Sequence, residues 1–351
     1  MGAILALAFC LASCKANGDD GTTSGGTEKQ AGSISYATTT VSKTTADAAF
    51  TNALTKTGDG TVSYASSKET VATVNATTGE VTIKGVGETT ITATVADSDT
   101  YTYETKTANY TLTVTYYIGT KAPTEAKAVG DIVFSDGSAT PYSTNLSLTD
   151  EQKAAAVAVI FYVGTELNSG DDTTTSRTLG VGLVHNWNWL VWCTSSAAAY
   201  SKNITTIQCP ASGSKGALTF TGDKDGSDNL DQIEAFDGVD DTATEANYPA
   251  FYFAKNYASQ TGSHVSGTAY ESGWYLPTIA ELFQIWKNKT TVDAASALCG
   301  GPKFDWRSYW SSSQFASNDN ASYRLSFDDG DWGSNTKNGS YVCVCAVRAF
   351  N

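Results

Sequence analysis

The sequence predicts two folded domains, an all-β sandwich followed by an α+β domain. Residues 32–116 carry short runs in which apolar and polar residues alternate, the pattern of half-buried strands. Helix signals begin only near residue 150, and all eight Trp lie between Trp187 and Trp332. A light Thr/Val core therefore precedes a dense aromatic core, and 351 residues are enough for two domains.

The composition favours an exported protein without a nucleic-acid partner. Thr, Ser, Gly and Ala are abundant and charged residues make up 17% of the chain, which is typical of exported β-rich proteins. The formal net charge is −14. Proteins that bind nucleic acids need a surplus of Lys and Arg to neutralise phosphates, so this partner is disfavoured.

Residues 1–14 are predicted to be a signal peptide. The apolar run Ala3–Ala12 is too short to span a bilayer, and it is followed by Ser13 and Cys14. Residues 11–14, Leu-Ala-Ser-Cys, resemble a bacterial lipobox. The resemblance implies cleavage before Cys14, a lipid on its sulfur, and an outer-membrane or cell-surface location. A plain signal peptide with an incidental Cys is the alternative. Residues 15–31 are polar and rich in small residues, so they predict a flexible tether.

The first domain is predicted over residues 32–116. Its strands are "GSISY", "TVSYAS", "TVATVN", "EVTIK", "TTITATV" and "NYTLTVTY", separated by turn signals such as Thr78-Gly79. Several short strands at this spacing predict a β-sandwich. The segment resembles the bacterial Ig-like group 2 domain of adhesins, which implies a spacer or stalk. A carbohydrate site on the sandwich is the alternative.

The second domain is predicted over residues 128–351, after a linker at residues 117–127. A strand, a turn and an irregular piece occupy residues 129–142, and further strands are expected at 158–163 and 181–193. Thr149 with Gln152, and Thr278 with Glu281, have the spacing of capping boxes that begin helices. Helices are also expected at 247–258 and 291–301. Mixed strands and peripheral helices indicate an α+β fold.

Four motifs in the second domain resemble a known family: "GWYLPTIAELFQIW", "YWSSSQ", "YRLSFDDG" and "YVCVCAVRAF". Their order is similar to the C-type-lectin-like fold that formylglycine-generating enzymes share with exported ligand-binding domains. The closest resemblance is to Treponema variable protein A-like lipoproteins of diversity-generating retroelements. This implies a fixed scaffold whose C-terminal segment, about residues 305–345 here, is rewritten at selected codons to change the ligand.

The strand at residues 322–328 supports this division of roles. Tyr323, Leu325 and Phe327 fall on one face and are predicted to be buried. The opposite face is free to vary without cost to folding. Turn signals at 329–330 and 338–339 indicate a polar loop system held between two buried strands, the arrangement of a binding face on a scaffold.

The family resemblance implies that adenines in Asn codons are randomised. The predicted ligand-binding residues are small, polar or aromatic, and each is an amino acid that such codon changes can produce. They are Asp305, Arg307, Tyr309, Phe315, Ser322, Arg324, Ser326, Asp328, Asp331, Gly333, Ser334, Asn335, Asn338 and Ser340. Trp306, Trp310, Gln314, Trp332 and Lys337 fall outside those outcomes and are predicted to be fixed scaffold. Ordinary solvated loops favour the same small polar residues, so that alternative stays open.

Catalysis is not predicted. Formylglycine-generating enzymes use reactive cysteines several residues apart, whereas Cys343 and Cys345 lie two apart among Val and Ala, which predicts inert thiols. Cys193 and Cys209 are predicted either to form a disulfide bridge or, like Cys299, to be small buried residues. The histidines lack a neighbouring nucleophile motif, and His185 is expected to pack in the core.

No metal and no cofactor are predicted. The segment "DKDGSDNLDQIE" has acidic residues at EF-hand-like offsets, but Asp228 stands where the turn requires Gly. A solvated acidic loop is therefore favoured there, and also for Asp328, Asp329 and Asp331. The predicted partner is a protein or glycan on another cell or host surface. An invariant adhesin or envelope protein of the same fold is the main alternative, and a formylglycine-generating-type enzyme is a distant one.

Overall fold

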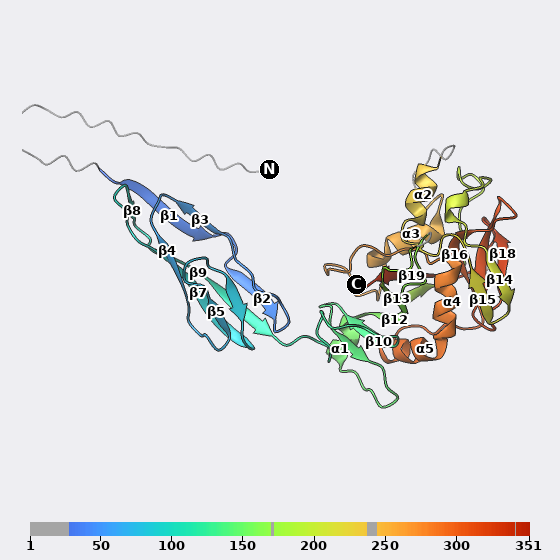
Figure 1. Ribbon diagram of the computed structural model, residues 1–351, viewed down its shortest axis with the longest axis horizontal. Helices are drawn as coiled ribbons and strands as arrows, with labels where there is room; N and C mark the ends of the chain where they lie inside the picture. The colour runs from blue at the N-terminus through green and yellow to red at the C-terminus, as the bar shows by residue number, and fades with distance from the viewer. Residues whose placement is uncertain (1–27, 170–171, 237–243, 341) are drawn as a thin grey trace, which may run out of the picture. The chain divides into compact units, whose positions relative to one another are not determined.

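The computed structural model describes residues 28–169, 172–236, 244–340 and 342–351 (Figure 1). The chain divides into two compact units. The first holds the residues up to Lys43 and Ala48–Val114, and the second holds Thr44–Asp47 and Thr115–Asn351. The predicted signal peptide, Cys14 and the tether up to residue 27 lie outside the described residues. No helix in the described part of the chain has the length and hydrophobicity to cross a membrane.

The described part of the first unit contains strands and no helix. They pair in three sheets, β3-β1-β8, β2-β9-β7-β4 and β5-β6 (Figure 1). The strands are β1 (Gln30–Tyr36), β2 (Thr40–Thr44), β3 (Leu54–Thr57), β4 (Val62–Ser66), β5 (Ala72–Val74), β6 (Val81–Ile83), β7 (Gly87–Val95), β8 (Tyr101–Tyr103) and β9 (Thr107–Thr115). Each predicted strand is confirmed. The short strands β2, β3 and β8 were not predicted. β2 and β3 contain one apolar residue each, which shows no alternation.

Alternating burial along β7 and β9 forms the core of the first unit. Ile91 of β7 lies opposite Tyr110 of β9, and both are buried with Leu112. The ring of Tyr110 meets the ring of Tyr36 edge to face at 4.9 Å. The predicted tether extends too far, because β1 already begins at Gln30 and pairs with β8.

The second unit is also mainly β-sheet. Its sheets are β11-β10-β12-β13-β19, β16-β17-β18 and the hairpin β14-β15. The strands are β10 (Asp131–Phe134), β11 (Ala139–Pro141), β12 (Ala156–Gly164), β13 (Arg177–Asn186), β14 (Ala211–Ser214), β15 (Ala217–Phe220), β16 (Ser308–Gln314), β17 (Ala321–Ser326), β18 (Trp332–Thr336) and β19 (Val344–Ala349). The helices are α1 (Asp150–Ala155), α2 (Asn229–Ala235), α3 (Pro249–Lys255), α4 (Ile279–Lys287) and α5 (Lys289–Leu298), with 3-10 turns at Thr205–Ile207 and Tyr257–Ser259.

Both predicted capping boxes are confirmed. At the start of α1, the Thr149 hydroxyl accepts a hydrogen bond from the backbone N–H of Gln152. At the start of α4, the Thr278 hydroxyl accepts one from the backbone N–H of Glu281. In each case the third residue of the helix accepts a bond from the backbone of the cap. These contacts depend only on residues three apart, so a sequence pattern can predict them.

Four predictions about the second unit are corrected. Residues 117–127 are not a free linker, because Ile118 and Lys121 hydrogen-bond to the turn and strand at Asp136 and Ala139. The segment that was predicted to be irregular after the turn contains the regular strand β11, Ala139–Pro141. The strand predicted at 181–193 ends at Asn186. The apolar run "YVCVCAVRAF" predicts a central strand, but β19 is the end strand of its sheet.

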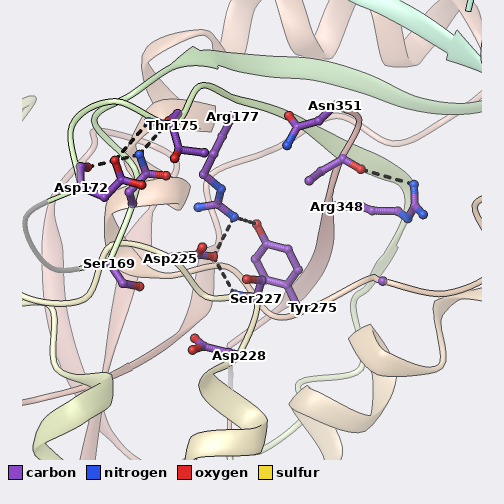
Figure 2. A pocket seen from close by; sticks show the side chains of 13 residues that line it. Ser169, Asp172, Thr175, Arg177, Asp225, Ser227, Asp228, Tyr275, Arg348 and Asn351 are labelled. Carbon is purple, nitrogen blue, oxygen red and sulfur yellow. Dashed lines mark hydrogen bonds and ion pairs between the residues drawn. The ribbon is translucent and has the colours of Figure 1, made fainter.

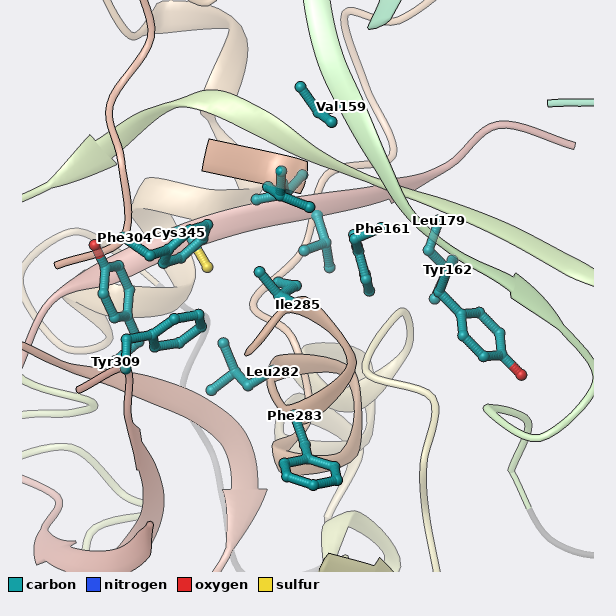
Figure 3. Packing of buried hydrophobic residues seen from close by; sticks show 14 of the residues in the cluster. Val159, Phe161, Tyr162, Leu179, Leu282, Phe283, Ile285, Phe304, Tyr309 and Cys345 are labelled. Atoms are coloured by element: carbon teal, nitrogen blue, oxygen red, sulfur yellow. The ribbon is translucent and has the colours of Figure 1, made fainter. Parts of the chain in front are cut away.

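Helix α4 joins the two larger sheets through the core. It contacts β12 of the five-stranded sheet and β16 and β17 of the three-stranded sheet. Figure 3 shows Leu282 and Ile285 of α4 between Phe161 on one side and Tyr309 and Phe304 on the other. This packing fixes the three-stranded sheet against the rest of the unit.

Candidate functional site

The candidate site is the face of the three-stranded sheet that turns away from this core. Strand β17 pairs with β16 and β18, with Arg324 opposite Trp310 on one side and Gly333 on the other. Because side chains alternate along a strand, the odd-numbered residues Tyr323 and Leu325 point to the opposite face.

The inward face is buried as predicted. Tyr323, Leu325 and Phe327 are each at most 3% exposed. The ring of Phe327 stacks on Phe304 with centroids 4.3 Å apart, and it meets the ring of Tyr309 at 4.9 Å. These aromatic contacts hold β17 on the core regardless of the side chains on its other face.

The outward face carries a half-exposed cation. The Arg324 guanidinium donates to the Ser308 hydroxyl at 2.8 Å and lies over Gly333, which has no side chain to obstruct it. Ser326 is half-buried beside it, and its amide donates to the carbonyl of Asp331. Arg324, Ser326, Gly333 and the turn at Asp331 therefore belong to one surface, as predicted.

The remaining predicted polar residues lie at the ends of this sheet. Asp328, Asp331, Ser334, Asn338 and Ser340 are exposed, and Asn335 is half-buried. Ser334 pairs with Tyr323, so it belongs to the other face of β18. The sheet thus brings most of the predicted residues to one end of the unit without placing all of them on one face.

Three predicted binding residues are corrected. Tyr309 is 0% exposed, and its hydroxyl pairs with His185 inside the core. Ser322 is buried with its hydroxyl donating to the Ser313 carbonyl. Phe315 packs against Tyr323 and the nearby ring of Trp332 on the inward side. These side chains belong to the scaffold.

One predicted scaffold residue belongs to the surface. Trp306 is 71% exposed. The Arg307 guanidinium lies 4.8 Å from the centroid of Trp187 and 5.3 Å from that of Trp306, and Asp305 forms an ion pair with it. Arg307 is thus held in place by aromatic and acidic neighbours at the start of β16. Trp187 was not predicted, because its position beside Arg307 depends on the fold.

The other predicted scaffold residues are buried or half-buried. Trp310, Gln314 and Lys337 are buried, and Trp332 is half-buried. The Lys337 ammonium donates to the carbonyls of Ala199 and Lys202, and burial lowers its pKa to about 8. Lys337 therefore anchors the end of the polar segment to the neighbouring loop.

The turn between β17 and β18 is also anchored. Asp329 forms an ion pair with Lys215 of the β14–β15 hairpin, and this hydrogen bond lowers the pKa of Asp329 to about 2. Gly330 adopts a positive φ of 69° and lies against the Trp286 ring, where a Cβ would come within 2.5 Å of the ring. Asp328 and Asp331 are left facing solvent.

The cysteine side chains lie in the core, where they pack as small apolar groups. Cys193, Cys209, Cys299, Cys343 and Cys345 are all buried thiols, and no disulfide bridge joins Cys193 to Cys209. Burial raises the pKa of Cys343 to about 11 and raises that of Cys345 further. A thiol that stays protonated at neutral pH is a poor nucleophile.

The acidic segment at residues 223–234 does not form a chelating loop. Asp225 forms an ion pair with Arg177 at 2.7 Å, and Asp223 accepts a bond from Ser169. Among the described residues, no group of three or more His, Cys, Asp or Glu is placed to hold a metal ion. His185 is buried as predicted, and burial lowers its pKa to about 3.

Comparisons with known proteins match both units. Residues 183–348 match the family model described as the Lcl C-terminal domain, and residues 51–97 match the intimin immunoglobulin-like domain. Among curated proteins, none matches the chain. A solved fimbrial protein from Bacteroides ovatus is similar at 13% identity with a TM-score of 0.43, over 90% of this chain and 70% of that chain. The intimin match agrees with the predicted immunoglobulin-like part, and the Lcl match falls within the second unit.

Proposed function

We propose that this chain is an exported lipoprotein that binds a ligand through an exchangeable face of its second domain. The second domain has a C-type-lectin-like fold, the immunoglobulin-like domain is a stalk, and Cys14 carries the lipid. The observation that carries the proposal is the division of β17 into a buried aromatic face and a polar face around Arg324.

The chemistry of the outward face suits a protein or glycan on another cell. Arg and Trp side chains dominate the affinity of protein interfaces, and Arg307 and Trp306 stand together at the edge of this face. The small polar side chains around them supply adaptable hydrogen bonds, as in antibody loops. The family match over residues 183–348 supports a surface-protein role, and the intimin-like match supports the stalk.

We propose no catalytic role. Cys343 and Cys345 are buried with raised pKa values, and His185 is neutral in the core. The two cysteines lie in the larger hydrophobic core, and His185 packs against the rings of Trp187, Phe304 and Tyr309. Their environment supports a scaffold function for the residues that resemble an enzyme family.

A double substitution tests the binding face. Beads coated with the whole chain are applied to a panel of bacterial and animal cells, and attachment is counted. We expect the wild type to attach to at least one cell type and Arg324→Ala/Asp328→Ala to lower attachment roughly tenfold, about 1.4 kcal/mol. Both side chains are at least partly exposed, so the unfolding midpoint is expected to stay unchanged.

A matched control uses the other end of the second unit. Asp150→Asn in α1 changes a fully exposed carboxylate and is expected to leave attachment unchanged. Equal attachment by the double variant and the wild type would remove the support for this face. A near-identical template copy of the last coding stretch beside a reverse transcriptase gene distinguishes a diversified protein from an invariant adhesin.

A further inference from the structure

A cleft with two compartments lies outside the proposed binding face. One compartment is a polar cavity of about 600 Å³, and the other is a more apolar cavity of about 410 Å³. Ser227, Gly273 and Tyr275 line both, so the compartments adjoin. None of the described residues between 305 and 345 lines either one. Their sizes are those of small-molecule sites.

The cationic side chains of the polar compartment are already engaged. Figure 2 shows Arg177 between Asp225 and Tyr275, at 2.7 Å and 2.9 Å. Its other terminal nitrogen donates to Glu281 and to a carbonyl, and the guanidinium is 6% exposed. All three nitrogens of Arg348 donate to backbone carbonyls. Arg177 is thus enclosed by its partners, and Arg348 is held by carbonyls through three of its five N–H groups.

Carboxylate oxygens remain available in the same compartment. Asp225 accepts its bonds from Arg177 and the Ser227 amide through Oδ1, which leaves Oδ2 at the partly exposed edge. Asp228 lines the cavity as an exposed side chain (Figure 2). Behind them Asp223 is 7% exposed, and its Oδ2 has no hydrogen-bond partner among the described residues. These carboxylates can therefore still accept hydrogen bonds from a ligand.

The second compartment has mainly apolar walls, although Asp231, Lys255 and Asn256 also line it. Phe251 and Trp274 are almost fully buried beside Leu276, and Leu230 of α2 forms part of the rim. The Trp274 indole nitrogen donates to the Tyr270 carbonyl, which holds the ring in place. An aromatic or aliphatic group that enters here removes apolar surface from water on both sides.

We propose that this cleft binds a small organic cation, with its protonated amine at Asp225 and Asp228 and its apolar body against Phe251 and Trp274. An amine supplies only donors and a positive charge, which complements the carboxylate oxygens of this compartment. Its lining carries three carboxylates, Asp172, Asp225 and Asp228, against the two guanidinium groups of Arg177 and Arg348. A hydrogen bond between charged groups is stronger than one between neutral groups, so the amine end sets the specificity. The proposal stands apart from the surface around Arg324.

The test compares three ligands of one size by titration calorimetry on the whole chain. They are 2-phenylethylamine, 2-phenylethanol and phenylacetate. We expect the amine to bind with a Kd of about 1 mM or below, the alcohol at least tenfold more weakly, about 1.4 kcal/mol, and the acid not at all. Equal affinity for amine and alcohol, or no heat with the amine, would overturn the proposal.

Substitutions locate the site. Asp228→Asn keeps the shape of the side chain and is expected to weaken amine binding by roughly fivefold to tenfold, with alcohol binding unchanged. Ser227→Trp fills the junction of the compartments and is expected to abolish both. Asp150→Asn is the control for a distant exposed carboxylate. Amine binding that survives both cleft variants, with wild-type unfolding midpoints, would place the ligand elsewhere and refute the proposal.

Discussion

Arg177→Met is expected to lower the free energy of unfolding of the second unit by about 3–5 kcal/mol, the usual loss when one partner of a buried ion pair is removed. Arg177 donates to Glu281, which is 0% exposed, and to the Tyr275 hydroxyl and Asp225. Without the guanidinium, the Glu281 carboxylate stays buried with only Tyr275 and the cap of α4 as donors.

The loss is expected to depend on pH. Burial raises the pKa of Glu281 to about 7 from 4.5, while Arg177 opposes this rise. A carboxyl that holds its proton more tightly in the folded state adds stability below about pH 4.5, and this is lost as the pH rises through about 7. Removing Arg177 raises the pKa of Glu281 further, so the variant loses more at about pH 8 than at about pH 5.

Urea unfolding followed by Trp fluorescence measures this loss. All eight Trp lie between Trp187 and Trp332, so the signal reports the second unit alone. Arg177→Met/Glu281→Gln is the control, because Gln keeps the cap of α4 and removes the unpaired charge. We expect it to recover about half of the loss. If the free energy of unfolding of Arg177→Met lies within about 1 kcal/mol of the wild-type value at pH 8, the pair does not stabilise the fold.

Tyr309→Ala is the second substitution with a large expected effect. We expect it to lower the free energy of unfolding of the second unit by about 3–5 kcal/mol. The Tyr309 ring lies 4.9 Å from the centroids of both Phe304 and Phe327, and its hydroxyl meets His185 at 3.1 Å. Truncation leaves a cavity where β16, β17 and the five-stranded sheet meet. The same unfolding measurement gives the loss.

Tyr309→Phe separates the ring from the hydroxyl. It keeps the packing and removes one buried hydrogen bond, so we expect a loss of about 1 kcal/mol. A role for Tyr309 on the binding surface makes the opposite prediction, namely stability within about 0.5 kcal/mol of the wild type for Tyr309→Ala. That result would return Tyr309 to the set of ligand residues.

Local patterns were the part of this fold that the sequence could predict. The capping pairs Thr149–Gln152 and Thr278–Glu281 depend on residues three apart, and the alternation of Tyr323, Leu325 and Phe327 depends on residues two apart. Both periods are fixed by backbone geometry, so they survive without knowledge of tertiary contacts.

Burial of the outward face at one end of β17 could not be predicted in this way. Ser322 lies opposite Gln314, whose side-chain amide bonds to Lys202 and Ile204. The loop that contains Lys202 and Ile204 covers that end of the sheet, and it lies more than a hundred residues from Gln314 in sequence. A period-two pattern identifies which residues share a face, but it does not show which other segments cover that face.

The surface roles of Trp306 and Trp187 show the same limit. The size of Trp306 favours burial, yet it stands exposed beside Arg307, while Trp187 supplies the second ring from the end of β13. The cleft at Arg177 is assembled from five separate parts of the chain, within residues 168–169 and 172–177, 225–231, 251–256, 272–276 and 348–351. Only the tertiary fold brings such groups together.

The central claim is that buried aromatics fix the three-stranded sheet, so the polar residues around it are exchangeable. It is tested most directly by the free energy of unfolding of one variant with Asp328, Asp331, Ser334, Asn338 and Ser340 all changed to Ala. We predict a loss below about 1–2 kcal/mol, against about 2–5 kcal/mol for the single change Leu325→Ala. A loss in the fivefold variant as large as that of Leu325→Ala would contradict the account.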